Sequence, residues 1–213
     1  MNCDFIAPWY EPVEYLCFGR GLQRRRTAFL ENLADSRRAI SFGEGDGRFT
    51  AALLRSNPHV EVTAVDASRR MQQIAERRVA MMGQSFRERA EFHCAEIGAF
   101  DPGSTKYDLI ATHFFFDCFS TDATRDVIQR IAGWAAPRAQ WVVSEFHQPP
   151  GRLRHFWTGT VIRSLYAAFR VTTGLRVVRL PNYRPALVSA GFKLQRQEFA
   201  CGGLLVSELW ERG

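Results

Sequence analysis

The sequence predicts an α/β fold, a doubly wound and mostly parallel sheet of seven strands that ends in an antiparallel hairpin. Two observations lead to this prediction. Between residues 38 and 146, short apolar segments alternate with segments of helical periodicity, which is typical of a parallel sheet covered by helices on both faces. Near the end of the chain, two strand-like segments flank Ala200-Cys201-Gly202-Gly203, which predicts a hairpin.

The order of these segments predicts where a ligand would bind. We expect strands over residues 38–42, 60–65, 91–94, 107–113, 140–146, 192–199 and 204–210. We expect helices over residues 22–34, 49–56, 68–82, 121–134 and 181–190. Arg24, Arg25 and Arg26 are expected on the solvent side of the first helix, Ser68 is expected to cap the third, and Thr121 or Asp122 is expected to open the fourth. Right-handed crossovers bring the carboxyl ends of parallel strands to one edge of the sheet. Ligands of such folds bind at that edge.

The length of 213 residues favours a single domain over residues 1–213. Residues 1–36 are expected to form an N-terminal cap segment. Residues 148–180 are expected to form a helical insertion over the ligand edge, because residues 152–170 alternate basic and apolar side chains at roughly helical spacing.

The amino-acid composition excludes several classes of protein for this chain. Hydrophobic residues make up 46% of the chain, enough for a sizeable core, but no apolar run is long enough to span a membrane. The five cysteines are odd in number and include no C-x-x-C pair, which argues against a disulfide framework or a zinc site. The first residues, Met1-Asn2-Cys3-Asp4-Phe5, lack a basic region followed by an apolar one, so we expect no signal peptide. We therefore expect a cytoplasmic protein with no bound metal.

The most informative segment is Gly43-Glu44-Gly45-Asp46-Gly47, which places glycine at every second position between a strand and a helix. Glycine has no Cβ, so a ligand can lie directly against such a turn. The next strand ends on Asp66, nineteen residues beyond Gly47. A carboxylate at that distance, at a strand tip, can accept hydrogen bonds from ribose hydroxyls. The combination predicts a pocket for an adenosine-containing ligand.

The spacing and charge of the turn indicate which ligand. The dinucleotide pattern G-x-G-x-x-G would require glycine at position 48 or 50, where the chain has Arg48 and Thr50. A pyrophosphate also favours a turn without carboxylates, whereas this turn carries Glu44 and Asp46. Two carboxylates suit a cationic ligand that contains an ammonium and a sulfonium.

On these residues the chain resembles the class I S-adenosylmethionine-dependent methyltransferases, whose G-x-G-x-G turn matches Gly43, Gly45 and Gly47. The resemblance implies a Rossmann-like fold, S-adenosyl-L-methionine as cofactor, and methyl transfer. A looser similarity, over residues 165–192, is to the small-molecule methyltransferases of ubiquinone and menaquinone biosynthesis.

The family's residue roles carry over by position. The resemblance implies that the glycine turn holds the methionine part of the cofactor, that Asp66 holds the ribose, that Ala67 lies beside the adenine, and that Glu96 accepts from the adenine amino group. The implied cofactor-binding residues are Gly43, Glu44, Gly45, Gly47, Asp66, Ala67, Glu96, Ile97 and Thr112. The chain departs from the family at Ser41, where many members have a carboxylate. We expect backbone carbonyls to meet the ammonium instead, with Glu44 or Asp46 compensating.

The reaction places modest demands on the protein. Methyl transfer from a sulfonium is an in-line displacement, for which proximity and alignment matter most. A base is needed only if the acceptor must lose a proton. His113 and His147 are the candidate catalytic residues, because each follows a predicted strand at the ligand edge.

The charge distribution bears on the acceptor. The net charge is +6, and the segment from Phe146 to Gln197 contains nine basic residues and no acidic one. Such a segment favours anionic partners. We expect a small, apolar or aromatic acceptor that bears an acidic group, and peripheral contact with an anionic membrane is a further hypothesis. A nucleic-acid substrate is not expected, because the fourth strand is followed by Phe114-Phe115 rather than the [DNS]-P-P-[YFW] motif of base methyltransferases.

Two alternatives stay open at this point. One is a module that binds S-adenosylmethionine without catalysis, since the displacement requires no particular side chain. The other is a nicotinamide-dependent oxidoreductase, which the glycine spacing and the acidic turn oppose.

Overall fold

The computed structural model describes residues 12, 15, 18–149 and 180–213. The predicted amphipathic helix over 152–170, most of the predicted insertion, and residues 1–11, 13–14 and 16–17 of the N-terminal cap segment lie outside these residues. Within the described part, no helix is long and apolar enough to cross a membrane.

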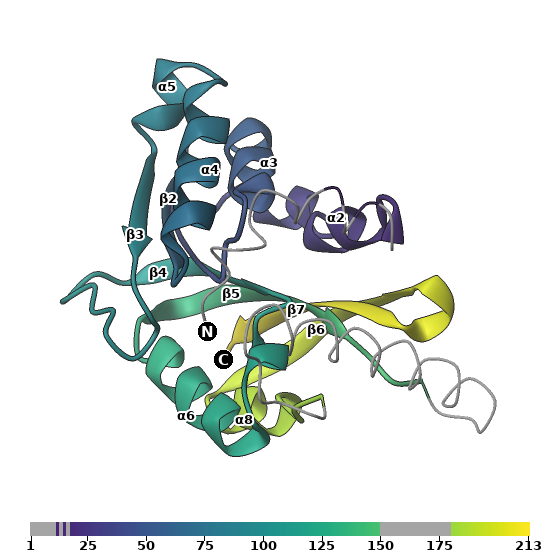
Figure 1. The fold of residues 1–213 in the computed structure, drawn as a ribbon. Coiled ribbons are helices and arrows are strands. Elements are labelled where there is room, and N and C mark those ends of the chain that lie inside the picture. The colour runs from purple at the N-terminus through teal and green to yellow at the C-terminus, as the bar shows by residue number, and fades with distance from the viewer. Residues whose placement is uncertain (1–11, 13–14, 16–17, 150–179) are drawn as a thin grey trace.

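Seven strands form one sheet in the order β3-β2-β1-β4-β5-β7-β6, as Figure 1 shows. They are β1 (Arg38–Phe42), β2 (Glu61–Asp66), β3 (Ala90–Cys94), β4 (Tyr107–His113), β5 (Ala135–Phe146), β6 (Phe192–Ala200) and β7 (Leu205–Arg212). Strands β1 to β5 are parallel, and β7 runs antiparallel to both β5 and β6. The predicted fold class is therefore confirmed.

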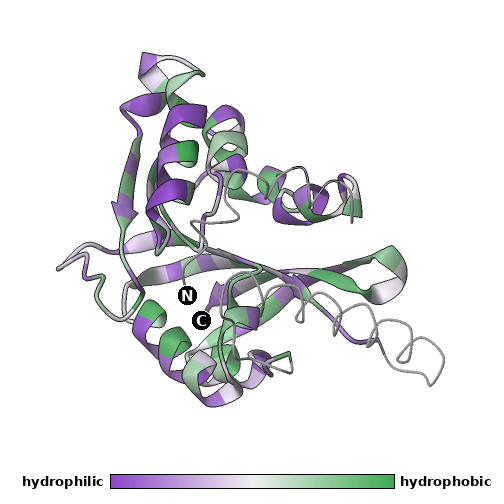
Figure 2. Ribbon diagram, viewed as in Figure 1, coloured by the Kyte–Doolittle hydropathy of each residue, from purple (hydrophilic) through white to green (hydrophobic). Residues whose placement is uncertain are grey.

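Helices cover both faces of the sheet. On one face lie α2 (Gly21–Arg26), α3 (Arg48–Ser56) and α4 (Arg69–Ala80), and on the other lie α6 (Thr121–Ala132) and α8 (Arg184–Ser189) (Figure 1). The short elements are η2 (Leu30–Leu33), α5 (Gln84–Arg87), η3 (Phe116–Cys118) and η4 (Cys201–Gly203). The helices carry both hydrophobic and hydrophilic segments in Figure 2, as expected for elements with one face on a core.

The sheet separates two hydrophobic cores, and strand alternation decides which side chain enters each. On β1, Ile40 and Phe42 pack on the side of α6 and α8, whereas Ala39 packs on the side of α3. On β4, Ile110 and Leu109 divide in the same way. Successive side chains of a strand point to opposite faces. Ser41 and His113 therefore face the α2–α3 side, and Thr112 faces the other.

Several predicted boundaries differ from the structure, and the two largest differences are at the end of the first helix and at the start of β5. The helix expected over residues 22–34 ends at Arg26. The hydroxyl of Thr27 donates to the carbonyl oxygen of Gln23 (3.0 Å), and such a side-chain bond competes with the backbone bonds that would continue the helix. Helix α6 begins at Thr121, one of the two predicted starts, and the hydroxyl of the preceding Ser120 accepts from the N–H of Ala123.

Strand β5 begins at Ala135 instead of residue 140. It pairs with β4 from that residue onward, across an irregularity of register, and Arg138 adopts a positive φ of 60° there.

Candidate functional site

The three glycines of the turn between β1 and α3 all have positive φ, and they serve different purposes. A Cβ on Gly43 would lie 2.6 Å from the Phe115 ring, and one on Gly47 would lie 2.6 Å from the Cα of Ala75. These two glycines permit close packing. Among the described residues, a Cβ on Gly45 would meet the carbonyl oxygen of Gly43 alone, at 4.0 Å. Gly45 therefore faces open space, as expected of a backbone cradle for a ligand.

Asp66 lies beside this turn, at the end of β2. Its Oδ2 accepts from the N–H of Gly45, and its Oδ1 accepts from the N–H of Ser68, both at 2.8 Å. Each carboxylate oxygen has more than one lone pair, so these bonds orient the group and leave acceptor capacity for a ligand hydroxyl. The structure thus brings together the two features that the sequence pattern linked.

The two carboxylates within the turn have different surroundings. Glu44 lies in the pocket, where its Oε2 accepts from the Ser41 hydroxyl (2.5 Å) and its Oε1 accepts from the N–H of Thr50 (3.0 Å). Burial raises the pKa of Glu44 to about 7, against the lowering effect of these hydrogen bonds.

Asp46 is held by arginines. Its carboxylate lies 2.8 Å from the Nε of Arg48 and 3.3 Å from the guanidinium of Arg78. The Nε of Arg78 also donates to the carbonyl oxygen of Asp46 (2.8 Å). Asp46 therefore stabilises the turn, and Glu44 is the carboxylate that faces the pocket with fewer charged neighbours.

The residues expected near the adenine lie one strand further along the edge. Asp66 pairs with Cys94 of β3, and the N–H of Ala95 donates to the carbonyl of Asp66 (3.0 Å). Ala67 and Glu96 are exposed at this edge, and Ile97 packs partly against the core. The structure places all three within the same stretch of edge as Asp66.

The two predicted site residues at the end of β4, Thr112 and His113, face opposite sides of the sheet. Thr112 is fully buried, and its hydroxyl accepts from the indole N–H of Trp141 (2.9 Å). Its side chain therefore belongs to the core on the α6 face. His113 lines the pocket on the opposite face, with its ring 4.4 Å from that of Phe49. Burial, and secondly the charge of Arg26, lowers the pKa of His113 to about 3, so the imidazole is neutral.

His147 lies elsewhere. It follows β5 and is bound to the hairpin: its Nδ1 lies 2.9 Å from the carbonyl oxygen of Gly203, and its ring packs on Phe199. It does not line the pocket that contains His113. The structure therefore does not bring the two candidate histidines together.

Glu145, at the end of β5, accepts hydrogen bonds from the backbone that follows β4. Its Oε1 accepts from the N–H groups of Phe115 (3.0 Å) and Phe116 (2.8 Å). Burial, together with the neighbouring Asp117 carboxylate, raises its pKa well above the usual value. Glu145 thus holds the bend after β4 in place.

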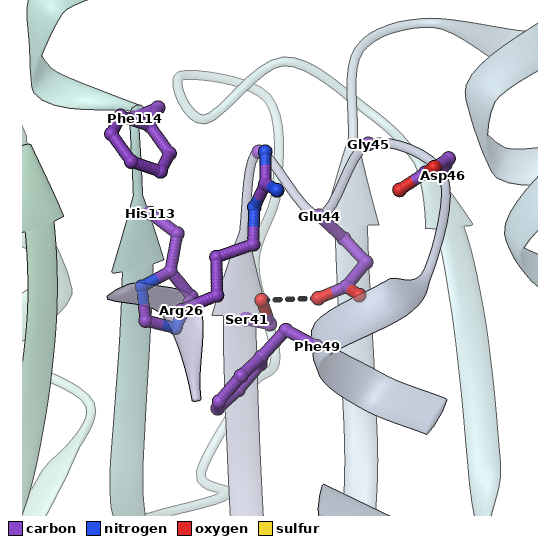
Figure 3. A pocket seen from close by; sticks show the side chains of 9 residues that line it. Arg26, Ser41, Glu44, Gly45, Asp46, Phe49, His113 and Phe114 are labelled. Carbon is purple, nitrogen blue, oxygen red and sulfur yellow. Dashed lines mark hydrogen bonds between the residues drawn. The ribbon is translucent and has the colours of Figure 1, made fainter. Parts of the chain in front are cut away.

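The pocket also contains residues that the sequence patterns did not indicate. It is lined by Arg26, Ser41, Gly43, Glu44, Gly45, Asp46, Phe49, His113 and Phe114, and Figure 3 shows the Arg26 side chain reaching between His113 and the turn. The Arg26 guanidinium lies 5.1 Å from the centroid of the Phe114 ring. The sequence favours a solvent-facing run for Arg24, Arg25 and Arg26. That prediction is wrong for Arg26 and also for Arg25, whose side chain is only 14% exposed, because α2 packs against β5 and β7.

Comparison with known proteins agrees with this geometry. Residues 40–140 match the family model described as a methyltransferase domain. No curated protein sequence matches the chain.

Solved structures share the fold at low sequence identity. Magnesium protoporphyrin IX methyltransferase from Synechocystis PCC 6803, with bound SAH, has a TM-score of 0.70 and 18% identity, over 93% of this chain and 86% of that one. The N-methyltransferase NodS from Bradyrhizobium japonicum WM9 has a TM-score of 0.63 and 15% identity, over 90% and 96%. Human N-acetylserotonin methyltransferase, in complex with SAM, has a TM-score of 0.65 and 17% identity, over 97% of this chain but 55% of that one.

The family match covers the glycine turn, Asp66 and the strands that carry them. The chain therefore has a methyltransferase domain over residues 40–140 and shares the fold of S-adenosylmethionine-dependent methyltransferases of known structure.

Proposed function

We propose that this enzyme methylates a small, apolar or aromatic acceptor that bears an acidic group, and that the pocket beside the glycine turn holds the methionine part of the cofactor. The observation that carries the proposal is the turn itself: Gly45 lines the pocket together with Glu44, its missing side chain leaves room among the described residues, and its N–H donates to Asp66. When bound, S-adenosylmethionine supplies an activated methyl group on a sulfonium.

Glu44 is the proposed counter-charge for the cofactor's ammonium. The family's carboxylate at the position of Ser41 is missing, but the Ser41 hydroxyl donates to Glu44 at 2.5 Å. The carboxylate of residue 44 therefore occupies space beside the side chain of residue 41. Burial disfavours the charged form of a carboxyl group, and an ammonium in the pocket would restore it. Of the two alternatives for the ammonium, this geometry favours Glu44 over Asp46.

Arg26 is the proposed partner of the cofactor's carboxylate. Its guanidinium enters the pocket from α2, across from Glu44 (Figure 3). A cation and a carboxyl group in one pocket match the two charges of an α-amino acid. Asp66 is the proposed acceptor from the ribose hydroxyls, and residues 67, 96 and 97 are proposed to lie along the adenine. The buried Thr112 side chain has no part in this arrangement.

The neutral state of His113 bears on the chemistry. A group with a pKa of about 3 is a weak proton acceptor near neutral pH. The site therefore supports alignment of the two reactants rather than strong base catalysis, in line with the low demand of a sulfonium displacement.

The acceptor class rests on charge and aromatic content. The nine basic residues between Phe146 and Gln197 favour an anionic acceptor. Beside the turn, Phe114 lines the pocket, and Phe115 packs between Phe42 and Phe119. Phe116, by contrast, is fully buried against Trp141 and Tyr183 and belongs to the core. A cytoplasmic location and contact with an anionic membrane stay predictions.

A two-step experiment tests the proposal. Calorimetric titration of the full chain with S-adenosylhomocysteine measures cofactor binding, with NADH as the negative control. Transfer of a labelled methyl group is then measured for aromatic carboxylic acids and for their uncharged amides. We expect turnover of acids in preference to the matched amides. Equal turnover of both, or turnover of amines alone, would contradict the acceptor class while leaving the cofactor site intact.

A further inference from the structure

The backbone of Phe114 has a conformation that phenylalanine rarely adopts. Its φ is 54°, in the left-handed region where the Cβ of an L-residue is crowded by its own backbone. Phe114 lines the pocket, whereas the other two non-glycine residues with positive φ in the described part, Arg138 and Cys201, do not. Strained residues persist where the surrounding structure holds them, and they cluster at functional sites. A bulky residue is thus kept in a strained conformation at the pocket wall.

Strand β5 holds the backbone at this point. The N–H of Phe114 donates to the carbonyl oxygen of Ser144 (2.7 Å), and the next two N–H groups donate to Oε1 of Glu145 (3.0 and 2.8 Å). None of these bonds uses the side chain of residue 114, so a glycine there would make them without strain. The bonds to β5 therefore explain the bend after β4, but they do not explain why the bend carries a phenylalanine ring.

The ring of Phe114 contacts a cation and another ring. The guanidinium carbon of Arg26 lies over the ring, 5.1 Å from its centroid, which is within the range of a cation–π interaction. The ring of Phe146 lies 5.3 Å from that of Phe114 and 5.8 Å from that of Phe18. Both Phe114 and Arg26 line the pocket (Figure 3). The aromatic neighbours support the Phe114 ring, and the ring in turn meets the guanidinium.

An aromatic ring suits the task of holding Arg26. The side chain of Arg26 leaves the last residue of α2, and fixing so long a side chain costs conformational entropy. A ring face attracts a guanidinium without occupying its N–H groups, which can still bind a carboxylate. An ion pair with Glu44, which lines the same pocket, would instead neutralise both charges. Contact with a ring therefore keeps the cation in place and leaves it able to bind an anion.

We propose that Phe114 is a positioning residue for Arg26: its left-handed backbone directs the ring against the guanidinium and holds that group where it binds the cofactor's carboxylate. This inference rests on the proposed role of Arg26. It gives the strain at residue 114 a function, because the backbone conformation sets the direction in which the ring leaves the chain.

The first test compares two ligands by calorimetric titration of the full chain: S-adenosylhomocysteine and its analogue without the α-carboxyl group. We expect Phe114→Leu to weaken binding of S-adenosylhomocysteine by about 3- to 30-fold, as for a lost cation–π contact, and to change the affinity for the analogue much less. Phe114→Tyr keeps a ring face and should retain most of the affinity. Phe86→Leu is the matched control, because it removes a similar contact with Arg89 (5.3 Å) outside the pocket.

A double-mutant cycle shows whether the ring acts through Arg26. We expect Arg26→Met to weaken binding of S-adenosylhomocysteine, and Phe114→Leu to add little further loss in the Arg26→Met background. A ring that merely supports the fold would cause the same loss in both backgrounds. Equal losses from Phe114→Leu in the two backgrounds would therefore overturn the inference.

The strain is tested by two substitutions that both remove the ring. Phe114→Gly relieves the positive φ, whereas Phe114→Ala keeps it. We expect Phe114→Gly to melt about 2–4 °C above Phe114→Ala, and both variants to bind S-adenosylhomocysteine more weakly than the parent chain. Equal melting temperatures would contradict the strain. Binding by Phe114→Gly as tight as that of the parent chain would show that the ring does not position Arg26.

The outcomes separate this inference from the proposed function. A loss of affinity in Arg26→Met but not in Phe114→Leu would remove the role of Phe114 and leave that of Arg26. An unchanged affinity in Arg26→Met would remove both roles, while the cofactor site itself stands. Failure of the folded parent chain to bind S-adenosylhomocysteine would remove the cofactor site together with both roles.

Discussion

The two walls of the pocket are built from contacts of very different range. In the glycine turn, Glu44 is bonded to Ser41 and Thr50, three and six residues away. In the wall around His113, the Ser144 hydroxyl is bonded to His113 and to the carbonyl oxygen of Arg25, 31 and 119 positions away. A short pattern can encode the first wall, because backbone conformation and neighbouring side chains define it. The second wall exists only once α2, β4, β5 and β7 have packed together.

The largest expected effect lies in the local wall. Gly45 and Gly103 share a φ of 65° and open space around a hypothetical Cβ, so valine imposes similar backbone strain at both positions. We expect Gly45→Val to abolish binding of S-adenosylhomocysteine, because the side chain would fill the cradle. Gly103→Val, outside the pocket, should bind like the parent chain. Calorimetric titration of both variants measures the difference, and equal affinities would contradict the assignment of the turn.

The same contrast explains what the sequence could predict. The positions of β1 and β4, the glycine turn and its pairing with Asp66 follow from local periodicity and from the regular spacing of strand, helix and strand. The pocket role of Arg26 does not follow, since three consecutive arginines give no sign of which one faces inward. The burial of Thr112 and the separation of His113 from His147 depend on strand parity and on the hairpin, which short patterns do not encode.

A second prediction concerns the carboxylate at the tip of β2. Asp66 accepts from the N–H of Gly45, and Asp101 makes the equivalent bond to Gly103 (2.9 Å) outside the pocket. We expect Asp66→Ala to weaken cofactor binding by about 1–3 kcal/mol, the loss of charge-assisted hydrogen bonds. Asp101→Ala should leave the affinity unchanged. An Asp66→Ala variant that binds as tightly as Asp101→Ala would remove Asp66 from the site.

The third prediction compares the two carboxylates of the turn. Glu44→Gln should weaken cofactor binding by about 1–2 kcal/mol without lowering the melting temperature, because it removes a desolvated charge. Asp46→Asn should lower the melting temperature, because it disrupts the ion pairs with Arg48 and Arg78. Calorimetry and thermal unfolding of the two variants measure both quantities, and the reverse pattern would exchange their roles.

The pH dependence of cofactor binding is expected to follow the ionisation of the Glu44 carboxyl group. The pKa of Glu44 is raised to about 7, so the free enzyme carries a neutral Glu44 below that pH. An ammonium ligand prefers the ionised form, and we expect affinity to rise as the pH passes through about 7 and then to level off, with proton release on binding. Titrations in buffers of different ionisation enthalpy measure that release. A similar slope in Glu44→Gln would exclude Glu44 as its source.

The free energy of unfolding depends on pH in the opposite direction to the affinity for the cofactor. The pKa of Glu44 lies above its ordinary value of 4.5, so the folded chain binds more protons than the unfolded chain between these values. The contribution of Glu44 to the free energy of unfolding is therefore full at low pH and is lost as the pH rises through about 7.

The smallest expected effect lies far from both walls. Arg138 has a φ of 60°, which costs a non-glycine residue about 1–2 kcal/mol, and its side chain is 87% exposed. Arg138→Gly should stabilise the fold by about 0.5–1 kcal/mol after the entropy cost of glycine, with no change in cofactor affinity. Denaturant unfolding measures the gain, and a loss of stability would mean that the Arg138 side chain contributes more than its backbone strain costs.

The most direct measurement is a crystal structure of the full chain with S-adenosylhomocysteine. The account predicts the methionine part against Gly45, with its ammonium at the Glu44 carboxylate, its carboxylate at Arg26 and its ribose hydroxyls on Asp66. A bound product whose methionine part lies outside this pocket, or whose ribose does not meet Asp66, would contradict it.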